Sequence, residues 1–368
     1  MPLHAPFRAD EVGSLLRPDP IKNARKAFAE DRIGRDELKA IEDNCIRDVV
    51  ARQEAVGLKA VTDGEFRRAW WHFDFLTGLG GVELVQGEKS IQFHGVQTKA
   101  DSIAITDKVE FDGHYMLEHF RFLKSVATVT PKMTIPAPSV LHFRGGRQAI
   151  NRDVYPRMDA FFEDTAEAYR QAVLAFYEAG CRYLQFDDTV WAYLCSEKER
   201  ESVRSRGEDP DPLPEIYADM INHALSSKPD DMVITTHVCR GNFRSSWISE
   251  GGYEPIAEKL LAGTHYNGYF LEYDTDRAGT LEPIRHLPKG DKRIVLGLIT
   301  SKSGDLEDKN AVEQRIEEAT GYVDLNQLCL SPQCGFASTE EGNILTEDAQ
   351  WKKLELIVDI ARETWGEV

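Results

Sequence analysis

The chain has 368 residues, of which 42% are hydrophobic and 29% are charged, so it can bury a large core beneath a well-solvated surface. Its formal net charge of −18 repels nucleic-acid phosphates and anionic lipids, which argues against both as partners. No apolar run reaches the roughly 18 residues that span a bilayer, and no secretory signal is visible at the start, so we expect a soluble cytoplasmic protein.

The first part of the chain predicts two strands, two helices and an excursion. In order, the predicted elements are a strand at 7–14, helices at 20–30 and 35–55, and a strand at 58–62. Gly57 is expected to end the second helix as a C′ glycine. From 80 to 126 the polarity alternates as in β-hairpins, for example at 90–94. We interpret this span as an insertion after the second strand and not as a separate domain.

The rest of the chain alternates between strands and helices. Strands are predicted at 132–136, 182–186, 232–236, 268–271, 293–298 and 325–330, and helices at 154–179, 214–225, 254–261, 281–286, 310–322 and 347–364. Residues 197–211 are interpreted as a charged loop. Eight strands that alternate with helices predict an α/β fold, a (β/α)8 TIM barrel that spans 1–368 as one domain. No G-x-G-x-x-G follows the first strand, which argues against a dinucleotide-binding sheet.

Candidate metal ligands lie where three of these strands end. His237 and Cys239 follow the fifth strand and are two residues apart, so their side chains point to the same face. Glu272 ends the sixth strand and Cys334 follows the eighth. Because the carboxyl ends of barrel strands share one mouth, these four groups complete a tetrahedral zinc shell. The alternative is a core histidine near buried cysteines, with Glu272 in a salt bridge.

Six short motifs at strand ends form a wider pattern. They are Val12-Gly13-Ser14, Asp63-Gly64-Glu65-Phe66, Gln185-Phe186-Asp187-Asp188, Thr236-His237-Val238-Cys239, Glu272 and Ser331-Pro332-Gln333-Cys334-Gly335. With these motifs the chain resembles, nearly from end to end, the catalytic barrel of cobalamin-independent methionine synthases and their short single-barrel relatives. The resemblance implies that His237, Cys239, Glu272 and Cys334 hold zinc. It also implies that Ser14, Glu65 and Asp187 bind homocysteine, with Glu65 and Asp187 as the catalytic residues.

The implied activity is zinc-dependent transfer of a methyl group to the thiol of homocysteine, which forms methionine. A free thiol with a pKa of about 8.5 is mostly protonated at neutral pH, whereas the thiolate is the nucleophile. Zinc deprotonates a thiol that it coordinates. Two thiolates and a carboxylate make the shell electron-rich, which suits attack on an alkyl carbon better than hydrolysis. Glu272 is the hardest ligand, so we expect it to loosen when the substrate sulfur enters.

Two positions on the side of the methyl donor depart from the family pattern. The family has a histidine at the end of the seventh strand, whereas this chain has Thr300, with Lys302 as a candidate acid or a surface lysine. The family's Asp-Glu-Pro run is replaced by Asp187-Asp188-Thr189. The donor therefore stays open between methyltetrahydrofolate, a methylated corrinoid protein and another activated compound. Four aromatic residues either stack on a flat donor or pack beneath a loop: Trp70, Trp71, Phe73 and Phe75.

Three other functions remain open at this stage. The first is a zinc-dependent alkyltransferase that acts on a different thiol, as in epoxide–thiol transfer. The second is a non-catalytic zinc-binding barrel, and the third is a metal-free barrel of the decarboxylase type. Glu65 and Asp187 also have a structural alternative, which is salt bridging with Arg67, Arg68 or Arg182. The sequence leaves the oligomeric state undetermined.

Overall fold

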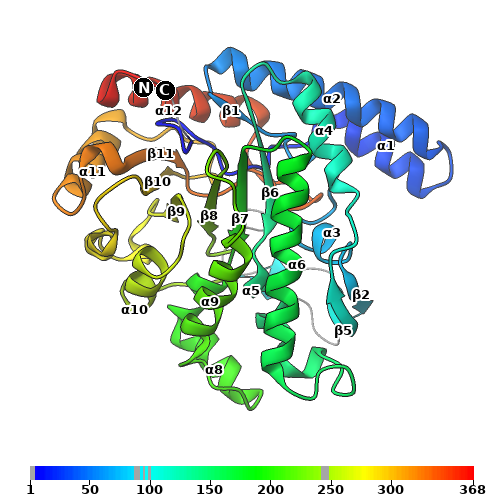
Figure 1. The fold of residues 1–368 in the computed structure, drawn as a ribbon. Helices are drawn as coiled ribbons and strands as arrows, with labels where there is room; N and C mark the ends of the chain where they lie inside the picture. Colours follow the sequence, from blue (N-terminus) through cyan, green and yellow to red (C-terminus); the bar gives the residue numbers. More distant parts are fainter. Residues whose placement is uncertain (1–4, 87–91, 94–95, 98–100, 242–247) are drawn as a thin grey trace.

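The computed structural model describes residues 5–86, 92–93, 96–97, 101–241 and 248–368. Its centre is one curled sheet of seven parallel strands (Figure 1). In spatial order these are β1 (Ala60–Val61), β6 (Thr130–Pro136), β7 (Tyr183–Asp188), β8 (Val233–Val238), β9 (Gly268–Glu272), β10 (Arg293–Ile299) and β11 (Leu328–Pro332). β7, β9 and β11 are buried along their whole length, as expected of a parallel sheet covered on both faces.

The segment 7–14 lies between the two edge strands and closes the ring. Ala9 forms a parallel bridge with β11, and the hydroxyl of Thr62, next to β1, donates to the carbonyl oxygen of Gly13 at 2.6 Å. The expected first strand is therefore reduced to a single bridge. The carboxylate of Asp10 accepts hydrogen bonds from two nearby amides, and such local bonds compete with a strand ladder. The predicted (β/α)8 TIM barrel is confirmed.

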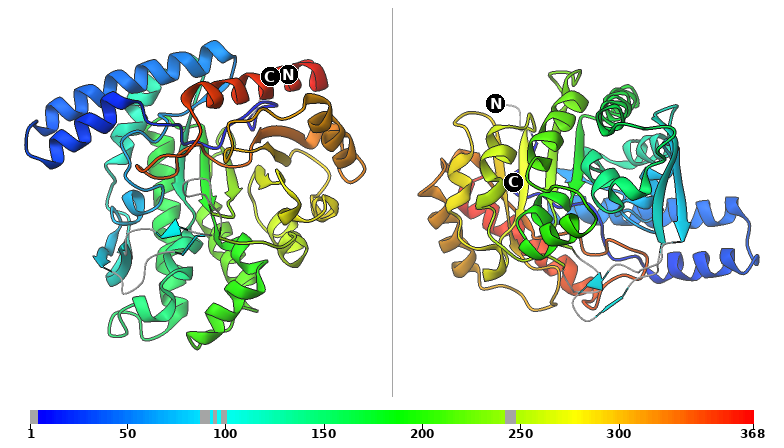
Figure 2. Two further views of the ribbon diagram at one scale, coloured as in Figure 1. Left: turned by 180° about the vertical axis from the view of Figure 1, so that it is seen from behind. Right: turned by 90° about the horizontal axis from the view of Figure 1, so that it is seen from below.

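Helices form the outer layer of the barrel (Figures 1 and 2). The longer ones are α1 (Asp19–Ala29), α2 (Arg35–Val56), α4 (Met116–Val126), α6 (Met158–Glu178), α9 (Leu213–Leu225), α11 (Lys309–Thr320) and α12 (Glu347–Trp365). Figure 2 shows α1 and α2 side by side, projecting beyond the barrel. α2 ends at Gly57, which has a φ of 108°, as the sequence predicted. None of the described helices is long and apolar enough to cross a membrane.

Short helices occupy several strand-to-helix connections. They are α3 (Phe73–Leu76), α5 (Pro138–Phe143), α7 (Val190–Leu194) and α10 (Glu254–Ala257), the last continued by a π turn over Glu258–Ala262. The predicted helix at 281–286 is a 3-10 helix over Glu282–His286, and the predicted strand at 325–330 opens with a 3-10 turn over Leu325–Gln327.

The prediction of a loop over 197–211 was wrong in its first half. Residues Glu197–Ser205 form the helix α8. Arg204 pairs with Glu201, three residues before it, at 3.3 Å, and opposite charges at this spacing stabilise a helix. Arg204 also pairs with Glu197, seven residues before it, at 2.6 Å. The many charged residues that suggested a solvated loop therefore lie on the exposed face of a helix.

The excursion after β1 contains antiparallel strands. β2 (Gly80–Gln86) pairs with β5 (Asp101–Glu110), and β3 (Gln92–Phe93) pairs with β4 (Val96–Gln97). Of the strand expected at 90–94, residues 90, 91 and 94 lie outside the described residues. Further along the 80–126 span, α4 packs against α2 and β6. The division of the chain into one domain with an insertion stays a prediction.

Candidate functional site

Four side chains meet at the carboxyl ends of β8, β9 and β11: His237, Cys239, Glu272 and Cys334. All four are buried, and one potential ligand atom of each lies within 4.8 Å of the other three. The two sulfur atoms are 3.5 Å apart, and both cysteines are free. Two zinc–sulfur bonds of about 2.3 Å at a tetrahedral angle place the sulfurs about 3.8 Å apart. The four groups therefore fit a tetrahedral metal site, and a donor set of two sulfurs, one nitrogen and one oxygen suits zinc.

The ring of His237 is oriented from both sides. Its Nε2 lies 3.1 Å from the carbonyl oxygen of Gln333, and donation of the Nε2 proton there leaves the lone pair of Nδ1 for a metal ion. Nδ1 also lies 3.7 Å from Asp187 Oδ1. Burial by itself would lower the pKa of His237, but Asp187 and the charge on Cys334 raise it to about 9. Without a metal the imidazole is therefore protonated, so a proton and a metal ion compete for the same nitrogen.

The side chains of Cys239 and Cys334 form a hydrogen bond with each other. Their mutual hydrogen bond raises the pKa of Cys239, which burial raises further, and lowers the pKa of Cys334. The amide of Gly241 donates to Cys239 Sγ at 3.3 Å. The hydrogen bond therefore favours the thiolate form of Cys334, and a divalent cation would bind in place of the protons held by these groups.

Glu272 is held by an amide and lies near two cationic side chains. Its Oε1 accepts the amide of Arg240 at 2.9 Å, and its Oε2 lies 3.4 Å from Arg277 Nη2 and 4.0 Å from Lys302 Nζ. The side chain of Lys302 is 10% exposed, so the interpretation of Lys302 as a surface lysine was wrong. Arg277 was missed by the sequence reasoning. It lies in a 3-10 helix over Asp276–Ala278, and its closeness to Glu272 in the chain was the only available signal.

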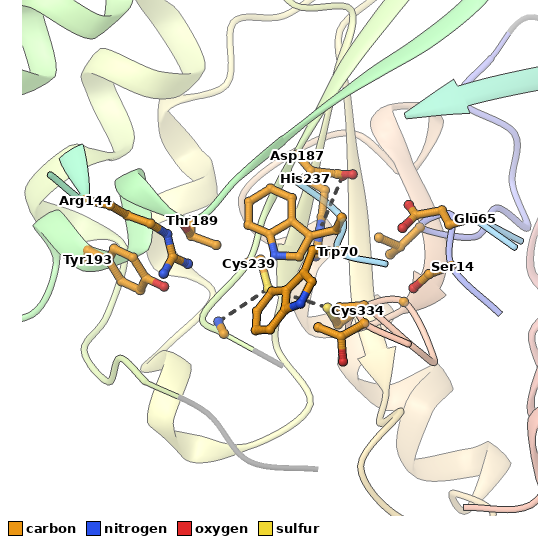
Figure 3. A pocket seen from close by; sticks show the side chains of 16 residues that line it. Ser14, Glu65, Trp70, Arg144, Asp187, Thr189, Tyr193, His237, Cys239 and Cys334 are labelled. Carbon is orange, nitrogen blue, oxygen red and sulfur yellow. Dashed lines mark hydrogen bonds and ion pairs between the residues drawn. The ribbon is translucent and has the colours of Figure 1, made fainter. Parts of the chain in front are cut away.

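Ser14, Glu65 and Asp187 line one cavity together with three of the four cluster residues (Figure 3). This cavity opens to solvent. The predicted substrate-binding residues and the predicted metal ligands therefore lie in one place. Thr300 is not among the cavity-lining residues; its amide instead donates to Glu307.

Glu65 is held in an uncommon backbone conformation. Its φ is +59°, in the left-handed region that a side chain with a Cβ rarely adopts, and the preceding Gly64 has a φ of +65°. The amide of Glu65 donates to Asp63 Oδ1 at 2.9 Å, which stabilises this turn. Strain of this kind is retained where it aims a functional group, and here it follows β1 at the mouth of the barrel.

The carboxylate of Glu65 is only partly satisfied. Its Oε1 accepts from Thr134 Oγ1 at 2.8 Å and lies 3.4 Å from Arg68 Nη1, whereas its buried Oε2 has no hydrogen-bond partner. Burial and the charge of Asp187 raise the pKa of Glu65 to about 7, against the opposing effect of Arg68. Of the salt bridges considered from the sequence, the one with Arg68 is present, while Arg67 and Arg182 pair with other carboxylates.

Asp187 and Ser14 flank the same space. Asp187 Oδ1 accepts from Gln185 Nε2 at 2.7 Å, which fixes the carboxylate at the end of β7. Ser14 Oγ accepts the amide of Ala337 at 3.3 Å. A Cβ on Gly335 would lie 2.1 Å from Ser14 Oγ, so the glycine after Cys334 leaves room for that hydroxyl.

Several further residues line the cavity, and the sequence assigned them only in part. Trp70 and Trp71 line it, whereas Phe73 and Phe75 pack in the hydrophobic core. Arg144, Thr189 and Tyr193 also line the cavity. Arg144 and Tyr193 belong to connections after β6 and β7, and no motif in the sequence singled them out.

The chain is a TIM barrel with a candidate metal centre. A buried imidazole, two thiols and a carboxylate meet at the carboxyl ends of its parallel strands. Residues 7–363 match the family described as cobalamin-independent synthase, catalytic domain. The chain belongs to this family, and the resemblance found from its motifs is confirmed.

Relatives of this chain extend over nearly its whole length. The uncharacterized protein YxjH of Bacillus subtilis is 52% identical over 362 residues, which cover 98% of this chain and 95% of that protein. The methionine synthase of Sulfolobus acidocaldarius is 22% identical over 331 residues, which cover 88% of this chain and 84% of that protein. A crystal structure of the putative vitamin-B12 independent methionine synthase from Listeria monocytogenes has a TM-score of 0.81 and 44% identity, and 99% of each chain is covered. A B12-independent methionine synthase from Shewanella sp. W3-18-1, in complex with selenomethionine, shares the fold at a TM-score of 0.71 and 18% identity, covering 97% of each chain.

Proposed function

We propose that this chain is a zinc-dependent methyltransferase that transfers a methyl group to the thiol of homocysteine and forms methionine. The observation that carries the proposal is the shared cavity. Groups suited to an amino acid line the same space as a cluster suited to a thiol-binding metal. Membership of the family supports the same activity.

In this proposal Glu65 and Asp187 bind the α-ammonium group of homocysteine. The Oε2 atom of Glu65 is buried without a partner, and a ligand ammonium would supply the missing hydrogen bond. Ser14 presents a hydroxyl for the carboxylate of the same ligand. With its backbone held there, the ligand extends its thiol toward Cys239 and Cys334, which line the same cavity.

Zinc held by His237, Cys239, Glu272 and Cys334 would supply a lowered thiol pKa, so that the acceptor is a thiolate at neutral pH. Glu272 has Arg277 beside its Oε2, so its carboxylate keeps a cationic partner when it is not a ligand. We therefore expect Glu272 to be the ligand that loosens when the substrate sulfur arrives. Zinc X-ray absorption with and without homocysteine checks this, and an unchanged sulfur count contradicts it.

The methyl donor stays open between methyltetrahydrofolate, a methylated corrinoid protein and another activated methyl or alkyl compound. In the altered Asp187-Asp188-Thr189 run, Asp188 has a structural use. Its carboxylate accepts Ser139 Oγ at 2.6 Å and the amide of Val190 at 2.7 Å, which ties α5 and α7 to the end of β7.

The test combines zinc analysis with product formation. We expect about one zinc per chain and methionine from homocysteine with at least one of methyltetrahydrofolate (mono- or polyglutamate) and methylcobalamin. Stoichiometric zinc without methylation of homocysteine by any of these donors contradicts the proposal.

The role of Glu65 gives a sharper test of the acceptor. Because its pKa is about 7, the carboxylate loses its charge as the pH falls below that value, and the KM for homocysteine should rise between pH 8 and pH 6. Glu65→Gln should raise KM about tenfold or more at pH 8 and remove this pH dependence. The exposed Glu317→Gln is the matched control. Initial rates at several homocysteine concentrations measure both effects, and an unchanged KM in Glu65→Gln argues for a different thiol.

A further inference from the structure

Three side chains that can donate hydrogen bonds lie on one side of the cavity. Figure 3 shows Arg144, Thr189 and Tyr193 together on one side and Ser14 and Glu65 on the opposite side. Three of the candidate metal ligands, His237, Cys239 and Cys334, lie between them. Arg144 directly follows α5, and Thr189 and Tyr193 belong to the turn into α7 and to α7 itself. The short helices at the ends of β6 and β7 thus bring the three groups to one corner.

Three polar atoms of this corner are buried without a well-formed hydrogen bond to any described residue. The hydroxyl oxygens of Thr189 and Tyr193 are buried, on side chains 2% and 4% exposed. They lie near each other, and neither has a partner of good hydrogen-bond geometry among the described residues. The Nε of Arg144 is also buried without a partner, and its guanidinium forms no ion pair with any described carboxylate. Buried polar groups are nearly always hydrogen-bonded in folded proteins, so three such groups at one wall of a cavity indicate a missing ligand.

The charge of the corner is positive. Burial, and then the charge of Arg144, lowers the pKa of His72 well below its ordinary value, so that the neighbouring imidazole is neutral. The charge of Arg144 also acts on the partly buried Glu199, which nevertheless lies beyond ion-pair distance. The protein as a whole repels anions, because its net charge is −18. An unpaired guanidinium at the wall of a cavity attracts an anion to that one place.

We propose that Arg144, Thr189 and Tyr193 form a subsite for an anionic group, a carboxylate or a phosphate, on the methyl donor. This inference rests on the proposed function, because it takes the opposite wall, with Ser14 and Glu65, as the place of the amino acid. A guanidinium and two hydroxyls supply the N–H and O–H donors that an oxyanion accepts. The body of the donor then lies along the cavity wall formed by the tryptophans, Trp70 and Trp71.

The first experiment measures anion binding directly. Inorganic phosphate and acetate are titrated into the full chain, with and without added zinc, and tryptophan fluorescence reports binding. Arg144→Met should weaken the binding of the preferred anion about tenfold or more. Tyr193→Phe keeps the ring, loses the hydroxyl and should weaken binding less. The exposed Arg152→Met is the matched control, and circular dichroism verifies that each variant is folded.

The second experiment places the subsite in the reaction. The preferred anion should inhibit methionine formation competitively against the methyl donor and not against homocysteine. Preference for phosphate or for acetate identifies the anionic group on the donor.

The outcomes separate the subsite from the proposed function. Binding that is absent, unchanged in Arg144→Met, or competitive with homocysteine overturns the subsite, even when methionine is formed. Binding that depends on Arg144 in a protein that methylates no homocysteine overturns the proposed function and leaves an anion site in the cavity.

Discussion

Glu272 differs from the other three candidate ligands because two cationic side chains lie beside its carboxylate. Arg277 is 3.4 Å and Lys302 is 4.0 Å from its Oε2. Both charges stabilise the carboxylate as a free anion, and both repel a metal ion at the cluster. The strength of metal binding is therefore set partly by residues that are not ligands.

Lys302→Met tests this balance at a single position. Removing one positive charge beside the cluster should strengthen zinc binding about tenfold, because a buried site screens charges poorly. Competition with a chromophoric chelator measures the affinity, and the exposed Lys352→Met is the control. Weaker zinc binding in Lys302→Met would mean that the lysine supports the site in another way.

At the scale of elements, the segment 7–14 closes the barrel with charged groups in place of a strand ladder. Lys132 Nζ pairs with Asp10 Oδ1 at 3.0 Å and donates to the carbonyl oxygen of Glu11. The carboxyl of Glu11 is buried, and its Oε1 has no hydrogen-bond partner. Burial, together with the charge of Asp10, raises the pKa of Glu11 from 4.5 to about 7, although Lys132 opposes the change. The segment is therefore most stable when this carboxyl is protonated.

The sign of the pH effect follows from that shift. The folded barrel gains stability from the protonated carboxyl of Glu11. This contribution to the free energy of unfolding is fully present below pH 4.5 and is lost as the pH rises through about 7. Glu11→Gln keeps a neutral side chain, so we expect it to match the wild type at pH 4 and to exceed its free energy of unfolding by about 3 kcal/mol at pH 8. Chemical denaturation of the zinc-free protein at both pH values measures the difference. The exposed Glu341→Gln should behave as the wild type, and a destabilised Glu11→Gln at pH 8 contradicts the prediction.

At the scale of the whole molecule, the candidate metal site joins β8, β9 and the loop after β11. An unfolded chain does not hold such distant residues together, so zinc binds the folded barrel preferentially and stabilises it. We expect zinc at 100 times its Kd to add about 2.7 kcal/mol to the free energy of unfolding. Differential scanning calorimetry with zinc and with a chelator measures the shift in Tm. His237→Ala should abolish the shift, and the exposed His265→Ala should retain it. Equal shifts in both variants would place the zinc elsewhere.

Much of the fold was predictable because its elements are repetitive. Helix α2 has apolar residues at helical spacing and a terminal glycine, and β7 and β8 are short apolar runs before polar motifs. The segment 7–14 and α8 were predicted wrongly. In the first, the side chain of Asp10 satisfies the local backbone, and in the second, ion pairs stabilise a helix of nearly all polar residues.

The sequence by itself determined which residues are available at the barrel mouth. In a parallel barrel the carboxyl ends of all strands face one way, so the strand ends placed His237, Cys239, Glu272 and Cys334 in one region before any coordinate was known. Tertiary structure decided what surrounds them. The cations beside Glu272 and the unpaired donors at Arg144 and Tyr193 come from short helices and connecting turns. Their directions depend on packing between elements far apart in the chain, which no local pattern of residues encodes.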